Sequence, residues 1–132
     1  TSALVKLVVA EPETAALREW LRQAGRELVA CDLVRTELIR AVRKAIPDRM
    51  LQARDVLDSL TLIRVSTSVF EAAGRLDPIA VRSLDAIHLA SALDLGDDLE
   101  GIVTYDDRLA HAASVNGVPV VSPRASPFRS DV

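Results

Sequence analysis

The segment that decides the fold of this chain is residues 82–93, Arg-Ser-Leu-Asp-Ala-Ile-His-Leu-Ala-Ser-Ala-Leu. Its leucines, isoleucine and alanines are typical of a buried helix, yet Asp85 stands in the midst of them. A buried carboxylate without a partner costs several kcal/mol, and no lysine or arginine follows Asp85 at i+3 or i+4. Something must therefore satisfy Asp85, and together with two other awkwardly placed acids, Glu37 and Asp106, it suggests a bound cation.

Asp85 also has a simpler interpretation. It falls in the first turn of the predicted helix, where an acid gains about 0.3–1 kcal/mol from the helix dipole, provided that the position is exposed. His88 follows at i+3 and could form a hydrogen bond with Asp85. A histidine on such a helix is more often a core residue or one that supports a ligand than a ligand itself.

A second acid, Glu37, lies on the apolar stripe of a helix predicted from Asp32, as its cap, to Ala45. The alternative places Glu37 at the edge of this stripe, paired with Arg40. Either way, Glu37 follows closely after an apolar strand predicted at residues 28–31, so it lies near the carboxyl end of that strand.

A third acid follows the strand predicted at residues 101–104. Asp106 and Asp107 stand together there, and aspartate is a preferred residue at a helix N-cap. We expect one of the two to cap the next helix while the other faces the cleft at the strand end. Ser66 or Thr67, and Ser83, are the caps predicted for two other helices.

The whole chain alternates helices with short apolar strands, with further strands predicted at residues 62–65 and 118–121. Strands of this kind form a short central parallel sheet covered by helices on both faces, which is an α/β fold. Ligands bind such sheets outside the carboxyl ends of the strands. The 132 residues have the length of a single domain, so residues 1–132 are taken as one unit.

Composition narrows the function. Aromatic residues make up 3% of the chain, which argues against base stacking as a means of binding nucleic acid. Cys31 is the single cysteine, which excludes a disulfide framework and fits a reducing, cytoplasmic compartment. The sequence contains no run of 18 apolar residues, so it predicts no membrane-spanning helix. The net charge is −3, but most of the basic residues are arginine, the side chain suited to phosphate contacts.

The three acids share a chemistry. Hard carboxylate oxygens without cysteine or a usable histidine pair suit Mg²⁺, or Mn²⁺, better than zinc. Clustered carboxylates with such ions hydrolyse phosphodiester bonds, because the metal activates a water molecule and neutralises charge on the phosphate.

Four motifs give the chain a resemblance that covers nearly its whole length. They are residues 1–7 (Thr-Ser-Ala-Leu-Val-Lys-Leu), 36–38 (Thr-Glu-Leu), 83–90 (Ser-Leu-Asp-Ala-Ile-His-Leu-Ala) and 104–106 (Thr-Tyr-Asp). In order and spacing they resemble the motifs of the PIN-domain family, and more narrowly those of VapC-like toxins from toxin–antitoxin pairs. The resemblance implies a PIN-like three-layer α/β/α fold.

The resemblance also implies a function. It implies a Mg²⁺-dependent endoribonuclease that cuts RNA, a VapB-like antitoxin that blocks the site, and a toxin homodimer. Three acids would be catalytic and would ligate the metal: Glu37, Asp85 and Asp106. The hydroxyls of Thr1 and Thr104 would lie near the metal or the phosphate. Three arginines would form a local basic track: Arg35, Arg40 and Arg43.

One departure from the family pattern concerns the first motif. In the family, an aspartate at the end of the first strand immediately precedes the Thr-Ser pair, whereas here Thr1 is the first residue. We expect the native protein to extend upstream by an apolar strand that ends in aspartate. The competing interpretation of the chain is a catalytically inactive PIN-like module that binds nucleic acid or protein without cutting.

Overall fold

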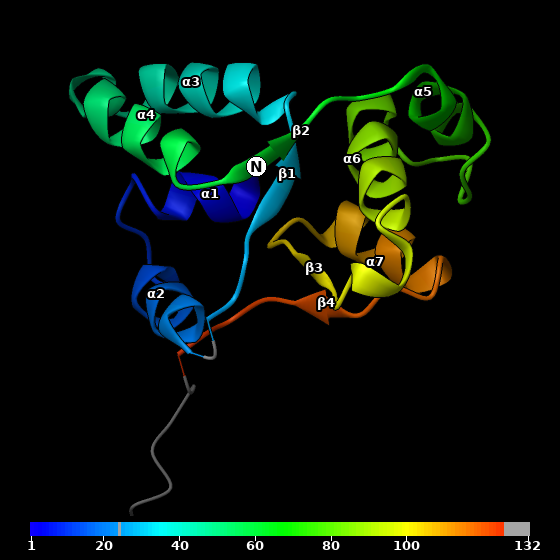
Figure 1. The fold of residues 1–132 in the computed structure, drawn as a ribbon. Coiled ribbons are helices and arrows are strands. Elements are labelled where there is room, and N and C mark those ends of the chain that lie inside the picture. The colour runs from blue at the N-terminus through cyan, green and yellow to red at the C-terminus, as the bar shows by residue number, and fades with distance from the viewer. Residues whose placement is uncertain (24, 126–132) are drawn as a thin grey trace, which may run out of the picture.

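The computed structural model describes residues 1–23 and 25–125. Within these residues, seven α-helices, two short 3₁₀ helices and four strands follow one another. They are α1 (Ser2–Lys6), α2 (Thr14–Arg22), β1 (Val29–Cys31), α3 (Val34–Ala45), η1 (Pro47–Arg49), α4 (Met50–Asp58), β2 (Thr61–Ile63), α5 (Thr67–Gly74), α6 (Ser83–Leu93), η2 (Gly96–Asp98), β3 (Ile102–Val103), α7 (Asp107–Val115) and β4 (Val120–Val121). Helices α1 to α4 lie on one side of the strands, and α5, α6 and α7 lie on the other (Figure 1).

The strands pair in parallel, as expected for an α/β fold. β1 pairs with β2, with Ala30 opposite Leu62, and β3 pairs with β4, with Ile102 opposite Val120. The predicted α/β class is confirmed, but the strands are only two or three residues long. In the described part of the chain they form two separate two-stranded sheets instead of one continuous sheet.

The core beside α3 follows from helical periodicity. Val34, Leu38 and Val42 recur at four-residue intervals and are almost completely buried against Leu4 of α1 and Leu57 of α4. Each such side chain contributes about 1.5–3 kcal/mol by leaving water. This core fixes the rotation of α3 about its axis, and therefore the direction in which Glu37 projects.

A second core holds α6 against α5 and α7, largely through alanine. Ala86 and Ala90 of α6 pack against Val69 and Ala73 of α5. On the other side of α6, Leu89 packs in a cluster that contains Leu109, Ala112 and Ala113 of α7 and Val118. Because alanine is small, the three helices approach closely, which leaves Asp85 and His88 directed away from these two cores.

Helix caps agree with the predictions in part. The Ser66 hydroxyl accepts a hydrogen bond from the Val69 amide at 3.2 Å, so the cap predicted for α5 is confirmed. The caps predicted at Asp32 and Ser83 are wrong, since α3 begins at Val34 and α6 already includes Ser83. The amide of Asp32 instead bonds the carbonyl of Ile63 at 2.9 Å, so the backbone at Asp32 still belongs to the β1–β2 pairing.

Helix α1 is too short to be stable alone, and polar contacts place it. At its start, the Ser2 hydroxyl accepts a hydrogen bond from the Tyr105 amide at 2.9 Å. At its end, the buried Lys6 ammonium group donates to Glu13 at 2.9 Å and lies over the ring of Tyr105. These contacts hold Thr1 at the ends of β1 and β3. No helix of residues 1–23 and 25–125 has the length and hydropathy needed to cross a membrane.

Candidate metal-binding acidic site

Three carboxylates from distant parts of the chain gather around Thr1. Glu37 comes from the first turn of α3, just after β1, Asp85 from the first turn of α6, and Asp106 from the position before α7, just after β3. The Thr1 hydroxyl contacts Glu37, and the next residue, Ser2, bonds the Tyr105 amide beside Asp106. Arg82 contacts both Asp85 and Asp106, so these contacts link the three carboxylates around the start of α1.

Glu37 is held by two donors on one oxygen. The Thr1 hydroxyl donates to Glu37 Oε1 at 2.7 Å, and His88 Nε2 contacts the same oxygen. Burial raises the pKa of Glu37, but the hydrogen bonds from His88 and Thr1 outweigh it and place the pKa below its ordinary value. Glu37 is thus an anion at neutral pH. The alternative that paired it with Arg40 is wrong.

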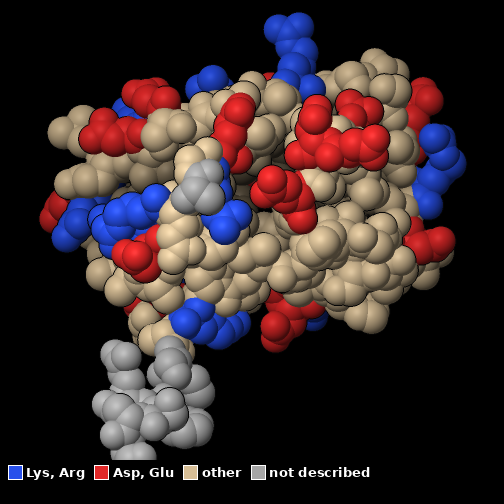
Figure 2. Space-filling view, turned by 60° about the horizontal axis from the view of Figure 1, so that its bottom comes forward, with Lys and Arg blue, Asp and Glu red and all other residues tan. Residues whose placement is uncertain are grey.

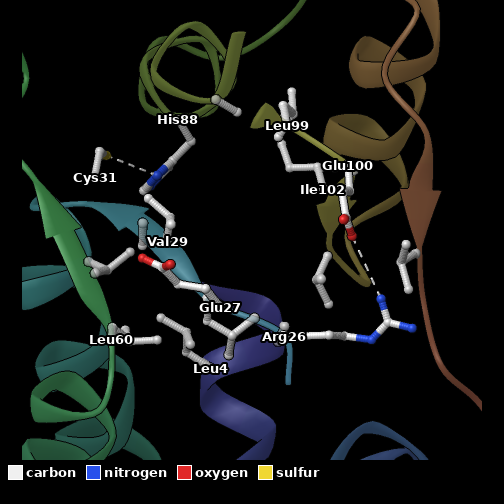
Figure 3. A pocket seen from close by; sticks show the side chains of 18 of the residues that line it. Leu4, Arg26, Glu27, Val29, Cys31, Leu60, His88, Leu99, Glu100 and Ile102 are labelled. Carbon is white, nitrogen blue, oxygen red and sulfur yellow. Dashed lines mark hydrogen bonds and ion pairs between the residues drawn. The ribbon is translucent and has the colours of Figure 1, made fainter. Parts of the chain in front are cut away.

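The i+3 spacing suggested that His88 could form a hydrogen bond with Asp85, but the structure places His88 against other residues. Its Nδ1 lies 3.2 Å from the Sγ of Cys31, and its Nε2 lies against Glu37. Figure 3 shows Cys31 and His88 pointing toward one another from β1 and α6. Burial lowers the pKa of His88, but contacts with Cys31 and Glu37 outweigh burial and raise it to about 9.

The contact also changes Cys31. Burial raises the pKa of its thiol, but the hydrogen bond and charge of His88, with hydrogen bonds from the Leu33 backbone and Ser91, together outweigh burial, so the pKa lies below its ordinary value. Sequence reasoning used Cys31 only as a sign of the redox compartment and missed its place beside the acidic site. The available signal was its position as the last residue of a strand that leads directly to Glu37.

Arg82 was also missed by sequence reasoning. Its Nε lies 3.4 Å from Asp85 Oδ2, and its Nη2 lies 3.5 Å from Asp106 Oδ2. The sequence argument looked for a basic partner only at i+3 and i+4 and found none, whereas Arg82 precedes Asp85 by three residues and contacts it. Although Arg82 Nε lies nearby, Asp85 Oδ2 is buried and has no hydrogen-bond partner in the described residues. The guanidinium therefore supplies charge to this oxygen without satisfying it.

Asp106 performs two tasks that had been divided between Asp106 and Asp107. Its Oδ1 accepts a hydrogen bond from the Leu109 amide at 3.0 Å, which caps α7, while its Oδ2 faces Arg82. Asp107 is exposed as the first residue of α7. The prediction that the two acids share these roles is wrong, because a carboxylate has two oxygens and one can cap while the other faces the site.

Thr104 is almost fully buried, at 2% exposure. Its hydroxyl accepts a hydrogen bond from the Asp106 amide at 3.1 Å and lies 3.3 Å from the Ser2 hydroxyl. Thr104 therefore shapes the turn that presents Asp106. A direct contact between the Thr104 hydroxyl and a metal or phosphate stays a prediction.

The three arginines predicted to bind RNA, Arg35, Arg40 and Arg43, are all exposed on α3, the helix that carries Glu37. Elsewhere the charge is mixed. Figure 2 brings the lower side of Figure 1 forward and shows acidic and basic side chains interspersed there, not one continuous basic surface. A basic track along α3 stays a prediction.

The donor atoms of the site fit a hard divalent cation. All three acids offer oxygen, and Asp85 Oδ2 is buried without a hydrogen-bond partner, which is an unfavourable position that a cation would relieve. Within residues 1–23 and 25–125, no three acidic, histidine or cysteine side chains already form a metal-binding group. In the described residues, His88 instead engages Glu37, and Arg82 bridges Asp85 and Asp106.

A cavity of about 750 Å³ adjoins the site, and Figure 3 shows part of its lining. It lies between the two sheets, because Val29 and Ala30 of β1 and Ile102 and Val103 of β3 all line it. The lining also includes Thr1, Cys31 and His88, so the cavity reaches the acidic site. Most of the other lining residues are aliphatic, with Arg26 and Glu100 paired at one side.

The fold and this site define a class: α/β proteins that gather carboxylates at the ends of parallel strands. The sequence matches the PIN domain family over residues 1–115. It is 44% identical over 123 residues to Ribonuclease VapC46 of Mycobacterium tuberculosis, covering 93% of this chain and 94% of the relative. Ribonuclease VapC47 of the same species is 40% identical over 129 residues, covering 95% of each chain. Ribonuclease VapC35, also of that species, is 38% identical over 126 residues, covering 93% of each. The chain belongs to the PIN domain family.

The position of Arg82 predicts competition with a bound cation. Arg82→Gln keeps the length of the side chain but removes its charge, so we expect Mg²⁺ to bind the free protein about two- to fivefold more tightly. The effect is small because Arg82 is 59% exposed, and exposed ion pairs contribute roughly 0.2–1 kcal/mol. Isothermal titration with Mg²⁺ measures the affinity. Arg35→Gln, which removes the same charge at another exposed position, is the control, and equal affinities for the two variants would contradict the prediction.

Proposed function

We propose that this protein is a Mg²⁺-dependent endoribonuclease and the toxin of a VapBC-like toxin–antitoxin pair, acting in the cytoplasm. The observation that carries the proposal is the set of carboxylates Glu37, Asp85 and Asp106 linked by Thr1, His88 and Arg82, with a buried Asp85 oxygen that no hydrogen bond from the described residues satisfies. The curated relatives support it, because all three are named Ribonuclease VapC and match nearly the whole chain. Mn²⁺ has the same preference for oxygen ligands and is the alternative ion.

In this proposal, Glu37, Asp85 and Asp106 hold the cation, which lowers the pKa of a water molecule and neutralises charge on the scissile phosphate. Glu37 is already anionic and is oriented by Thr1 and His88. Asp106 is fixed by its cap to the Leu109 amide. These contacts place two carboxylates before the cation arrives, so little reorganisation is needed when it binds.

The remaining residues act on RNA. Arg82 contacts both aspartates in the absence of a cation, and a cation held there would leave its exposed guanidinium free to contact a phosphate. Arg35, Arg40 and Arg43 extend this basic surface along α3. The Thr1 hydroxyl lies at the site itself and is positioned to contact the cation or the phosphate. Because the chain carries a net charge of −3, binding depends on these local arginines.

Asp85→Asn tests the enzymatic proposal against an inactive binding module. The amide keeps the shape but loses the charge that binds the cation, so we expect RNA cleavage in Mg²⁺ to fall by at least about 100-fold. The melting temperature should shift by only a few degrees, because the substitution removes only an ion pair with an exposed arginine.

The assay measures cleavage of total RNA by the purified protein, with Asp107→Asn as the control. Asp107 is exposed and lies beside the site without contacting it, so this variant should cleave RNA like the parent chain. Equal rates for parent, Asp85→Asn and Asp107→Asn would show that the cleavage does not come from this site. No cleavage by the parent chain would favour the inactive module.

The antitoxin is proposed from the relatives' names and from the exposed arginines of α3. An acidic or carboxyl-terminal segment of a VapB-like protein could clamp Arg35, Arg40 and Arg43 through charge-assisted hydrogen bonds. Co-expression with the neighbouring upstream reading frame should restore growth, and the two proteins should purify together, with the toxin itself as a homodimer. Reversing the charge in Arg40→Glu should weaken the complex. A neighbouring product that neither purifies with the toxin nor restores growth would contradict this pairing.

We also propose that an apolar strand ending in aspartate precedes Thr1 and occupies the cavity between β1 and β3. In the described residues each of these strands has one bonded neighbour, and their free edges line the same cavity as Thr1. A parallel strand there would pair both edges, join the two sheets and bury the aliphatic lining. Its terminal aspartate would then add a fourth carboxylate to the site.

N-terminal sequencing of the natural protein identifies this segment, and hydrogen exchange tests its position. We expect the amides of residues 29–31 and 102–103 to be more protected when the segment is present than in residues 1–132 alone, because ladder hydrogen bonds protect amides. The same segment carrying two prolines, which cannot donate to the ladder, is the control. A natural protein that begins at Thr1, binds Mg²⁺ tightly and cuts RNA would overturn the proposal.

A further inference from the structure

Glu37 receives both of its side-chain contacts on the same oxygen. The Thr1 hydroxyl donates to Oε1 at 2.7 Å, and His88 Nε2 lies against Oε1 from α6. Neither contact falls on Oε2. A carboxylate held by two donors at one oxygen has a fixed orientation, and the second oxygen remains available to a ligand.

The imidazole that holds Glu37 is itself fixed at its other nitrogen. Cys31 Sγ lies 3.2 Å from His88 Nδ1, and the His88 side chain is only 13% exposed. The His88 side chain therefore extends from α6, contacts β1 through Nδ1 and contacts α3 through Nε2. It cannot rotate without breaking contacts to two other elements. Figure 3 shows the ring extended from α6 toward Cys31.

The chemistry of the partners requires a hydrogen on the ring nitrogen that faces Glu37. An anionic carboxylate only accepts hydrogen bonds, so Nε2 must carry the hydrogen that faces Glu37. The thiol of Cys31 lies at Nδ1. Carboxylates that bind metals commonly rely on such hydrogen bonds for their orientation, and losing one typically costs 10- to 100-fold in metal affinity.

We propose that His88 is a positioning residue that orients Glu37 toward the cation, with Cys31 holding the imidazole in place. This inference rests on the proposed function, because it assigns Glu37 the role of a metal ligand. His88 acts through Glu37 and does not itself contact the cation. Without His88, Glu37 keeps the Thr1 hydroxyl as its one remaining side-chain donor, about which the carboxylate can rotate.

The test compares metal binding by His88→Leu and His88→Gln in the absence of RNA. Leucine fills similar space but cannot donate, so we expect the Kd for Mg²⁺, measured by isothermal titration, to rise about 10- to 100-fold. Glutamine offers an N–H at a similar reach, and should restore the affinity to within a few fold of the parent chain. His111→Leu, at the exposed histidine of α7, is the control and should bind Mg²⁺ like the parent.

RNA cleavage provides a second measurement. If His88 only orients a ligand, His88→Leu should need more Mg²⁺ for half-maximal cleavage, while kcat at saturating Mg²⁺ recovers most of its value. A metal affinity of His88→Leu equal to that of the parent overturns the inference, as does a failure of His88→Gln to restore it. Should His88→Leu not fold, His88→Asn takes its place, because its amide is too short to reach Glu37.

Two substitutions of Cys31 test the contact between Cys31 and His88 Nδ1 in the same way. Cys31→Ser retains a hydroxyl that can bond Nδ1 and should bind Mg²⁺ more tightly than Cys31→Ala; equal affinities would remove Cys31 from the proposal. These outcomes differ from a failure of the proposed function. In that case the parent chain itself would bind no Mg²⁺ or cut no RNA, and every variant would behave like the parent.

Discussion

The accumulation of negative charge around Thr1 is the constraint on which the rest of the site depends. Two carboxylates about 4 Å apart repel by roughly 4 kcal/mol at an effective dielectric constant near 20, so a fold that gathers three must supply positive charge or donors. This protein uses a different partner for each side of the site. His88 and Thr1 stabilise Glu37, while Arg82 lies between Asp85 and Asp106.

These partners differ in how firmly they are held. His88 is mostly buried and tied to Cys31, whereas Arg82 is largely exposed and its contacts are 3.4 and 3.5 Å long. The Glu37 side of the site is therefore rigid, and the aspartate side is held by a charge that can leave. In the proposed site, a cation between the aspartates would take the place of an exposed arginine, which would cost less than displacing a buried group.

The fold brings the acids together through strand ends and one short helix. Glu37 follows β1 and Asp106 follows β3, so each acid lies just past the carboxyl end of a strand. Helix α1 connects these regions, because Thr1 bonds Glu37 while Ser2 bonds the backbone beside Asp106. The short apolar helices around the strands thus serve to place a small set of polar side chains.

Local pattern was enough to predict much of this protein. The order of helices and strands and the α/β class follow from periodicity. Charges placed among apolar residues or at a strand end predict that Glu37, Asp85 and Asp106 form one site. Even Arg82 was within reach of local reasoning, since it lies one helical turn before Asp85. The sequence argument looked only at residues after Asp85, although in a helix the residue at i−3 lies as close as the residue at i+3.

Other features were decided by tertiary structure alone. His88 is 51 residues from Glu37 and 57 from Cys31, and no local spacing indicates which of several polar groups a helix will face after packing. The packing of α6 against α5 and α7 turned His88 away from Asp85 and toward β1 and α3. Likewise, the separation into two sheets depends on which strand edges meet in space. Sequence periodicity determines which face of an element is buried, whereas the partner of each polar side chain depends on contacts between elements that are distant in the chain.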